Sequence, residues 1–184
     1  FEKMLYDNGQ LVSLYAECFQ ATKNELYKKT VYETLEFIER ELTTDEGAFY
    51  SSLDADSVNN EGKLEEGAFY VWKIEELKSI LKEDFKLFSE YYNINNYGFW
   101  EHDNYVLIRK NSDIVVAKNN SITVSQLESK VEIWKKTLLQ LRTKRSRPRL
   151  DDKSLTSWNA LMLKGYIDAY KAFNEQRFLN VAIK

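Results

Sequence analysis

The sequence predicts a mostly α-helical protein with a small antiparallel β-hairpin insertion. Apolar residues recur at spacings of three and four over long stretches, and strands do not alternate with helices. The tetrapeptide Gly-Ala-Phe-Tyr occurs twice, at 47–50 and 67–70, with acidic residues between the copies. The chain has 184 residues, of which 43% are hydrophobic, so we expect a single domain, 1–184, with a real core.

The first half of the chain gives the clearest helical period. It covers residues 4–22 and 27–42, and the short separation between these segments predicts an antiparallel helical hairpin. The same period predicts shorter helices over 74–81 and 85–92. Residues 105–108 are typical of a short strand.

The two Gly-Ala-Phe-Tyr copies predict the hairpin. Aromatic residues alternate with small ones in both copies, so we expect them to pair with each other as antiparallel strands. Residues 54–62 are rich in Asp, Asn and Gly, which favour turns, and are expected to form a long connection between the strands.

The second half predicts two long helices. Ser125 to Glu128 reads as a capping box that starts a helix extending to about 141. Pro148 interrupts the helical pattern because it lacks an amide proton. The next helix is expected to be capped by Asp151 or Asp152, and another begins near Gln176.

Composition excludes several classes of function. The net charge is −3, and the basic residues 144–149 are followed at once by Asp151 and Asp152, so nucleic acid is not an expected partner. Charges interrupt every apolar run before it could span a membrane. The single cysteine, Cys18, excludes an internal disulfide, and a cytoplasmic setting is the default. No phosphate-binding glycine loop is present, and no cofactor is expected.

Four motifs resemble one family. They are Phe1–Asn8, Phe49–Ser57, Glu66–Trp72 and Asp151–Asn159, and they are similar to motifs of the spermatogenesis-associated, thioredoxin-domain-containing family. The resemblance implies an alpha/alpha toroid similar to six-hairpin glycosidases and N-acylglucosamine 2-epimerases, preceded in the full-length chain by a thioredoxin-like domain. It further implies that this chain is a partial toroid, the first part of a longer protein, with apolar helix faces that favour self-association.

The toroid resemblance implies a pocket for a sugar-like ligand, which the protein would bind or hydrolyse. Glycoside hydrolysis needs two carboxyl groups that flank the scissile bond. The candidate catalytic residues are Asp54, Asp56, Glu66, Asp151 and Asp152, and the candidate ligand-binding residues are Asp7, Tyr50, Tyr70, Trp72, Trp158 and Asn159. Each also has a structural interpretation, because Asp residues cap helices or shape turns and aromatic rings fill cores.

Three alternatives stay open. Asp54, Asp56, Asn60 and Glu65 follow an EF-hand-like spacing, although Val58 and Asn59 do not fit that loop. The only histidine, His102, cannot by itself form the histidine pair that a sugar epimerase often uses, although other segments of the full-length chain could supply a second histidine. The domain could also be a non-catalytic interaction scaffold for the attached thioredoxin-like domain.

Overall fold

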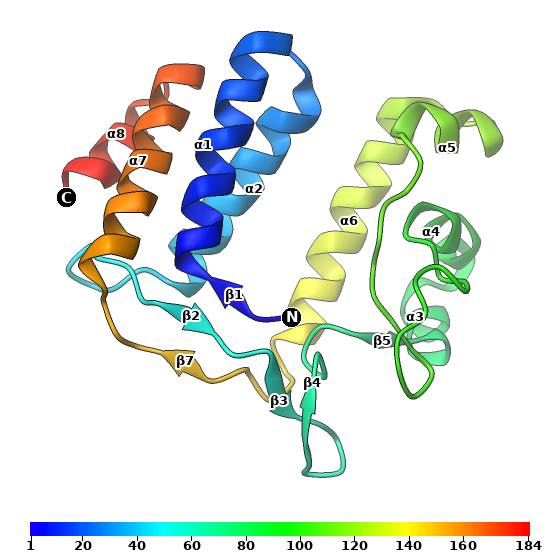
Figure 1. Ribbon diagram of the computed structural model, residues 1–184. Helices are drawn as coiled ribbons and strands as arrows, with labels where there is room; N and C mark the ends of the chain where they lie inside the picture. Colours follow the sequence, from blue (N-terminus) through cyan, green and yellow to red (C-terminus); the bar gives the residue numbers. More distant parts are fainter. The chain divides into compact units, whose positions relative to one another are not determined.

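The computed structural model describes residues 1–184 and consists mainly of helices, with three small antiparallel sheets (Figure 1). This confirms the mostly helical fold class. The helices are α1 (Leu5–Thr22), α2 (Glu25–Glu41), α3 (Ile74–Leu81), α4 (Phe85–Tyr91), α5 (Asp113–Asn119), α6 (Val124–Arg142), α7 (Thr156–Phe173) and α8 (Gln176–Ile183), with a 3-10 turn η1 (Lys82–Asp84). The strands are β1 (Lys3–Met4), β2 (Ser52–Leu53), β3 (Asp56–Val58), β4 (Leu64–Glu66), β5 (Trp72–Lys73), β6 (Asn104–Tyr105) and β7 (Leu150–Asp151). None of the helices combines the length and apolarity needed to cross a membrane.

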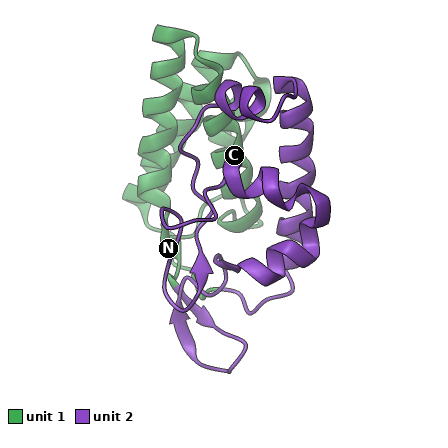
Figure 2. Ribbon diagram, turned by 90° about the vertical axis from the view of Figure 1, so that its right-hand side faces the viewer, with its two compact units in different colours: residues 1–55, 148–184 green, residues 56–147 purple.

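The chain divides into two compact units (Figure 2). Unit 1 comprises Phe1–Ala55 and Pro148–Lys184, and unit 2 comprises Asp56–Arg147. Unit 1 therefore contains both ends of the sequence, and each unit has a hydrophobic cluster of its own.

Unit 1 is built from α1, α2, α7 and α8. Helix α1 packs against both α2 and α7, and α8 packs against α7. The close contact of α1 with α7 depends on Gly9 and Gly165, since a Cβ atom at Gly9 would lie 2.9 Å from the backbone of Leu161. Side chains such as Leu5, Leu35 and Tyr166 are fully buried in the resulting core.

A three-stranded sheet lies at the start of α1. Strand β2 is in the middle and pairs antiparallel with β1 and with β7, so that Ser52 lies opposite Met4 on one side and Asp151 on the other. The pairing continues beyond the strands, because the Leu5 amide donates to the Ser51 carbonyl at 2.9 Å. The sheet thus joins three segments that are far apart in the sequence.

Unit 2 contains the other two sheets and four helices. Strands β3 and β4 form an antiparallel hairpin, and β5 pairs antiparallel with β6. Helix α6 contributes Leu127 and Trp134 to the core, where they meet Leu77 of α3 and Phe88 of α4. Asp84 of η1 links this turn to α6, since its carboxylate accepts a hydrogen bond from the Trp134 indole at 2.9 Å.

The predicted pairing of the two Gly-Ala-Phe-Tyr copies is wrong. The copy at 47–50 lies in unit 1, where Phe49 makes an isolated bridge with Thr43. The copy at 67–70 forms turns in unit 2, with the Tyr70 amide bonded to the Gly67 carbonyl at 2.7 Å. The hairpin forms instead from residues expected to be its loop, because Asn59 closes a tight turn by accepting the amides of Glu61 and Lys63.

Helix starts in the second half also differ from expectation. The capping box is formed by Thr123 and Gln126, not by Ser125 and Glu128. Neither Asp151 nor Asp152 caps α7, whose N-cap is Leu155 without a side-chain hydrogen bond. The chain is extended there because Asp151 belongs to β7. The predicted strand 105–108 is shorter and lies at Asn104–Tyr105, and α5 was not predicted.

Candidate functional site

Two of the family-like motifs bind each other in unit 1. The side chain of Asn159 acts as a partner for the backbone of Phe49, because its Oδ1 accepts the Phe49 amide at 2.8 Å and its Nδ2 donates to the Phe49 carbonyl at 3.0 Å. The Ser154 hydroxyl donates to the same carbonyl at 3.1 Å, and the Ser51 hydroxyl donates to the Lys153 carbonyl at 2.7 Å. Residues 49–53 are therefore fixed along their length by residues 150–159.

This arrangement gives the predicted ligand-binding residues of unit 1 structural contacts. Asn159 is committed to Phe49, and the Trp158 ring packs edge-on against Tyr6 with a centroid distance of 4.8 Å. Tyr50 is half-buried and packs against the hydrophobic core. Asp7 is exposed on α1. Asn159 also lines a pocket of about 530 Å³ in unit 1, together with Phe49 and Leu163.

Two predicted acids of unit 1 share a face of the sheet. Asp151 lies opposite Ser52, and the Asp54 amide donates to the Arg149 carbonyl at 2.9 Å, so the two acids are diagonal neighbours. The hydrogen bond from Lys153 holds the pKa of Asp151 below its ordinary value. Asp151 is therefore a carboxylate at neutral pH, which suits a base but not a proton donor. Asp152 is exposed and has no hydrogen-bond or ion-pair partner.

The remaining predicted acids, Asp56 and Glu66, lie in unit 2. They are directly opposite each other on β3 and β4, which places their Cβ atoms about 4.5–5.5 Å apart. Of the five predicted acids, these are the pair that the structure places in direct register. The same hairpin contains Asn60 and Glu65 of the EF-hand-like spacing, and its regular strands differ from a calcium-binding loop.

Arg145, which is not among the predicted site residues, organises the family-like motif Glu66–Trp72. Its guanidinium lies 4.0 Å from the centre of the Trp72 ring and donates to the carbonyls of Phe69 and Val71 at 3.1 and 2.7 Å. The other guanidinium nitrogen reaches both carboxylate oxygens of Glu76, at 2.9 and 3.0 Å. The sequence signal for Arg145 is its place in the basic residues 144–149, a run whose charge is offset by the following Asp151 and Asp152.

Trp72 and Tyr70 were expected to stack on a sugar. Trp72 is 2% exposed and belongs to the core of unit 2. Tyr70 is half-buried and packs edge-on against Phe69, and the Arg142 guanidinium lies 5.4 Å from its ring centre. Neither ring lines the pocket of this unit, which is described next.

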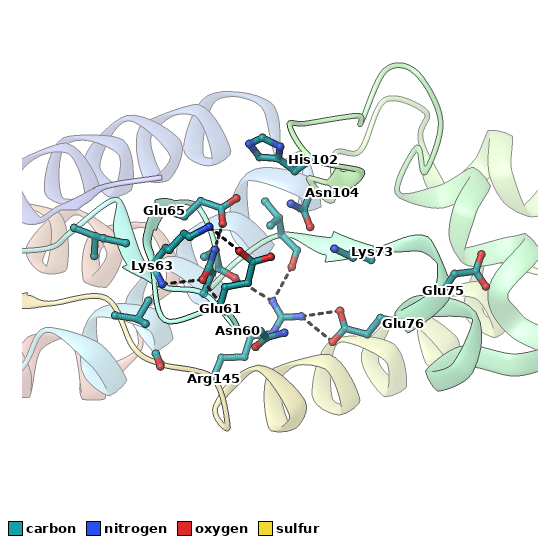
Figure 3. A pocket seen from close by; sticks show the side chains of 16 residues that line it. Asn60, Glu61, Lys63, Glu65, Lys73, Glu75, Glu76, His102, Asn104 and Arg145 are labelled. Carbon is teal, nitrogen blue, oxygen red and sulfur yellow. Dashed lines mark hydrogen bonds and ion pairs between the residues drawn. The ribbon is translucent and has the colours of Figure 1, made fainter.

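That pocket, which we call the hairpin pocket, has a volume of about 690 Å³ and lies within unit 2 (Figure 3). The β3–β4 hairpin, the β5–β6 sheet, the start of α3 and the segment after α6 supply its walls. Its polar side chains include Asn59, Glu61, Lys63, Glu65, Lys73, Glu75, Glu76, His102, Asn104 and Arg145. None of the eleven predicted site residues lines it.

Several of these side chains bind each other within the β3–β4 hairpin, on one wall of the hairpin pocket. Lys63 forms an ion pair with Glu61 at 2.9 Å, and Asn59 donates to Glu65 at 2.7 Å. Both pairs come from the hairpin, where the side chains crowd around the β3–β4 turn (Figure 3). The pocket therefore offers carboxylate and amide groups with defined positions, and no Phe, Tyr or Trp side chain lines it.

The fold and site thus define a mostly helical protein whose β-hairpin borders a polar pocket. No model of a known protein family matches the sequence. The chain is similar to spermatogenesis-associated protein 20 of Homo sapiens, with 32% identity over 202 residues that cover 99% of this chain. It is 31% identical to the protein of the same name from Mus musculus, in an alignment that covers 90% of this chain. It is also 31% identical to an uncharacterized protein of Caenorhabditis elegans, in an alignment that covers 100% of this chain. It spans 26%, 24% and 28% of the human, mouse and nematode proteins, respectively.

Proposed function

We propose that this chain is part of a thioredoxin-domain-containing protein of the spermatogenesis-associated family, and that it binds a sugar-like ligand in the hairpin pocket. The similarity to the human protein along almost the whole chain supports the family assignment. The helix pairs α1–α2 and α7–α8 of unit 1 suit hairpins of an alpha/alpha toroid, in which such pairs repeat.

The hairpin pocket is the observation that carries the ligand proposal. Its volume of about 690 Å³ is within the usual range for small-molecule sites, about 300–1,000 Å³. Sugar hydroxyls both donate and accept hydrogen bonds, so a sugar site needs acceptors and donors together. Glu65 of β4 supplies an acceptor, Asn60 of the hairpin turn and Asn104 of β6 supply amides, and all three line the pocket.

Binding is favoured over hydrolysis for this chain. Hydrolysis needs one protonated and one ionised carboxyl group at the scissile bond. Asp151 is held in its ionised form, and the register pair Asp56 and Glu66 does not line the hairpin pocket. We therefore propose recognition of the sugar as the function of the pocket.

Titration of the 184-residue chain with neutral sugars tests this proposal. Ligand-observed NMR with glucose, galactose and N-acetylglucosamine is expected to show saturable binding below about 10 mM. The Glu65→Gln variant is expected to bind about tenfold more weakly, because a charge-assisted hydrogen bond becomes a neutral one.

Glu128→Gln serves as the matched control, because Glu128 is exposed on α6 and does not line the pocket. Its affinity should equal that of the unaltered chain. Absence of binding for every sugar at 10 mM, or equal affinities for the two glutamine variants, would reject the pocket as a sugar site.

The catalytic role assigned to Asp152 stays a prediction with a clean test. Because Asp152 is exposed and caps no helix, Asp152→Asn should leave the melting temperature unchanged. Any sugar-directed turnover of the longer protein that depends on Asp152 should then fall by at least about 100-fold, since Asn cannot transfer a proton. Turnover and pH profile that match those of the unaltered protein would remove Asp152 from the mechanism.

A second candidate function is a non-catalytic scaffold. It is favoured by the structural use of the motif residues, since Asn159 and Trp72 are committed to packing and hydrogen bonds within their units. The sugar titration separates the two functions, because a scaffold predicts intact folding with no sugar binding.

A further inference from the structure

We infer that the ligand of the hairpin pocket carries an anionic group, a phosphate or a carboxylate, that is recognised by Lys73, Asn104 and His102. We call these three residues the anion edge. The inference rests on the proposed sugar-binding function and specifies its ligand as an anionic sugar.

The β5–β6 sheet positions two members of the anion edge. Lys73 and Asn104 are direct partners across this antiparallel pair, so their side chains leave the same face with Cβ atoms about 4.5–5.5 Å apart. Both side chains line the hairpin pocket (Figure 3). The ammonium group of Lys73 and the amide of Asn104 can thus reach one bound group together.

A tight turn adds His102 to the anion edge. His102 and Asp103 have positive φ angles of 53° and 59°, which few residues other than glycine adopt. The turn is held by a hydrogen bond from the Asn104 amide to the Glu101 carbonyl at 3.0 Å and by one from the Trp100 amide to the Asn104 carbonyl at 2.8 Å. His102 lines the pocket, whereas the neighbouring Asp103 does not.

Lys73 is the uncompensated cation of the pocket. Lys63 is paired with Glu61, and Arg145 is paired with Glu76, but Lys73 forms no ion pair. The side chains of Asn104 and His102 also have no hydrogen-bond partner within the protein. Three groups that can donate hydrogen bonds therefore face the pocket without an acceptor of their own.

The glutamates of the pocket do not cancel this preference. Glu61 forms an ion pair with Lys63, Glu76 with Arg145, and Glu75 with Lys78 at 2.8 Å. Glu65, which accepts from Asn59, keeps its charge and belongs to the hairpin wall. The pocket thus presents an acceptor on the hairpin and donors on the anion edge, an arrangement that suits a sugar with hydroxyls near one end and an anion at the other.

Competition between neutral and anionic sugars tests the inference. Dissociation constants of glucose, glucose 6-phosphate, glucuronate and inorganic phosphate are measured by calorimetry for the 184-residue chain. We expect at least one anionic sugar to bind tenfold or more tightly than glucose, and the phosphate and carboxylate arms show which group the edge prefers.

Three variants test whether the anion edge causes the preference for the anionic sugar. Lys73→Gln is expected to reduce the affinity for the anionic sugar to about that for glucose. Lys136→Gln, which removes an exposed charge from α6 outside the pocket, should keep the preference. Asn104→Ala should weaken anionic-sugar binding about fivefold, and thermal melts confirm that each variant is folded.

The outcomes separate this inference from the proposed function. Equal affinities for glucose and both anionic sugars, or a preference that survives Lys73→Gln, would overturn the anion edge and leave sugar binding in place. Failure of glucose and of both anionic sugars to bind would overturn the sugar-binding proposal itself. If inorganic phosphate displaces the anionic sugar from the unaltered chain but not from Lys73→Gln, the anion binds at the anion edge.

Discussion

Replacing Arg145 by methionine is expected to destabilise unit 2 by about 3 kcal/mol. Methionine keeps much of the apolar volume but removes the donors to Phe69 and Val71 and the bidentate pair with Glu76. The carbonyls are left without their donor, and the stacking on Trp72 is lost. The estimate is kept moderate because the Glu76 side chain is 42% exposed and water can solvate it.

Urea unfolding followed by far-UV circular dichroism measures the free energy, and hydrogen exchange localises the loss to residues 56–147. Lys144→Met is the matched control, since Lys144 is an exposed neighbour with no side-chain partner, and it should change stability by less than about 0.5 kcal/mol. Arg145→Lys should recover only part of the loss, because lysine lacks the planar fork. Equal free energies of unfolding for Arg145→Met and Lys144→Met would show that Arg145 does not stabilise the turn at residues 67–70.

Gly9→Ala is expected to destabilise unit 1 by about 2 kcal/mol and to lower the melting temperature of the 184-residue chain by about 4–8 °C. A Cβ atom at this position would lie 2.9 Å from both the carbonyl carbon and the carbonyl oxygen of Leu161. Those atoms are backbone, so α7 as a whole must move away from α1. Alanine favours an isolated helix over glycine by about 1 kcal/mol, and the clash must exceed that gain.

Gln10→Ala is the control for Gly9→Ala, because it places alanine in α1 at the exposed neighbouring position. It therefore reports the effect of alanine on α1 without the clash with α7. It should leave stability within about 0.5 kcal/mol of the unaltered chain. Gly165→Ala should resemble Gly9→Ala, since its Cβ would lie 2.8 Å from the Gly9 carbonyl oxygen. A higher melting temperature for Gly9→Ala would mean that the helices have room to separate at little cost.

Arg145 and Lys73 both line the hairpin pocket, and their different contacts allow stability and ligand binding to be tested separately. Arg145 lines the hairpin pocket and also holds the fold of unit 2, so its loss affects both. Lys73 lines the same pocket but is exposed and unpaired, so its substitution is expected to affect binding alone. Comparing Arg145→Met with Lys73→Gln therefore distinguishes a loss of binding caused by destabilisation of unit 2 from a loss of binding in a folded protein.

The sequence by itself determined the helices that depend on local spacing. Apolar side chains three and four residues apart share a helix face, and this pattern located α1, α2, α3 and α4 to within a few residues. The missing amide proton of Pro148 predicted the break in the helical pattern, and Pro148 lies after α6 and its flanking loop. These features could be predicted because each depends on residues less than two turns apart.

Only the tertiary structure decided the strand pairing and the site. Each strand has two or three residues, so its partner is chosen by distant contacts and not by its own pattern. Phe49 is fixed by Asn159, 110 residues away, and Val71 by Arg145, 74 residues away. For the same reason the hairpin pocket, which combines residues from 58 to 146, contains none of the predicted site residues. Local periodicity determines which segments are helical, whereas the surroundings of a polar side chain depend on the packing of segments that are far apart in the sequence.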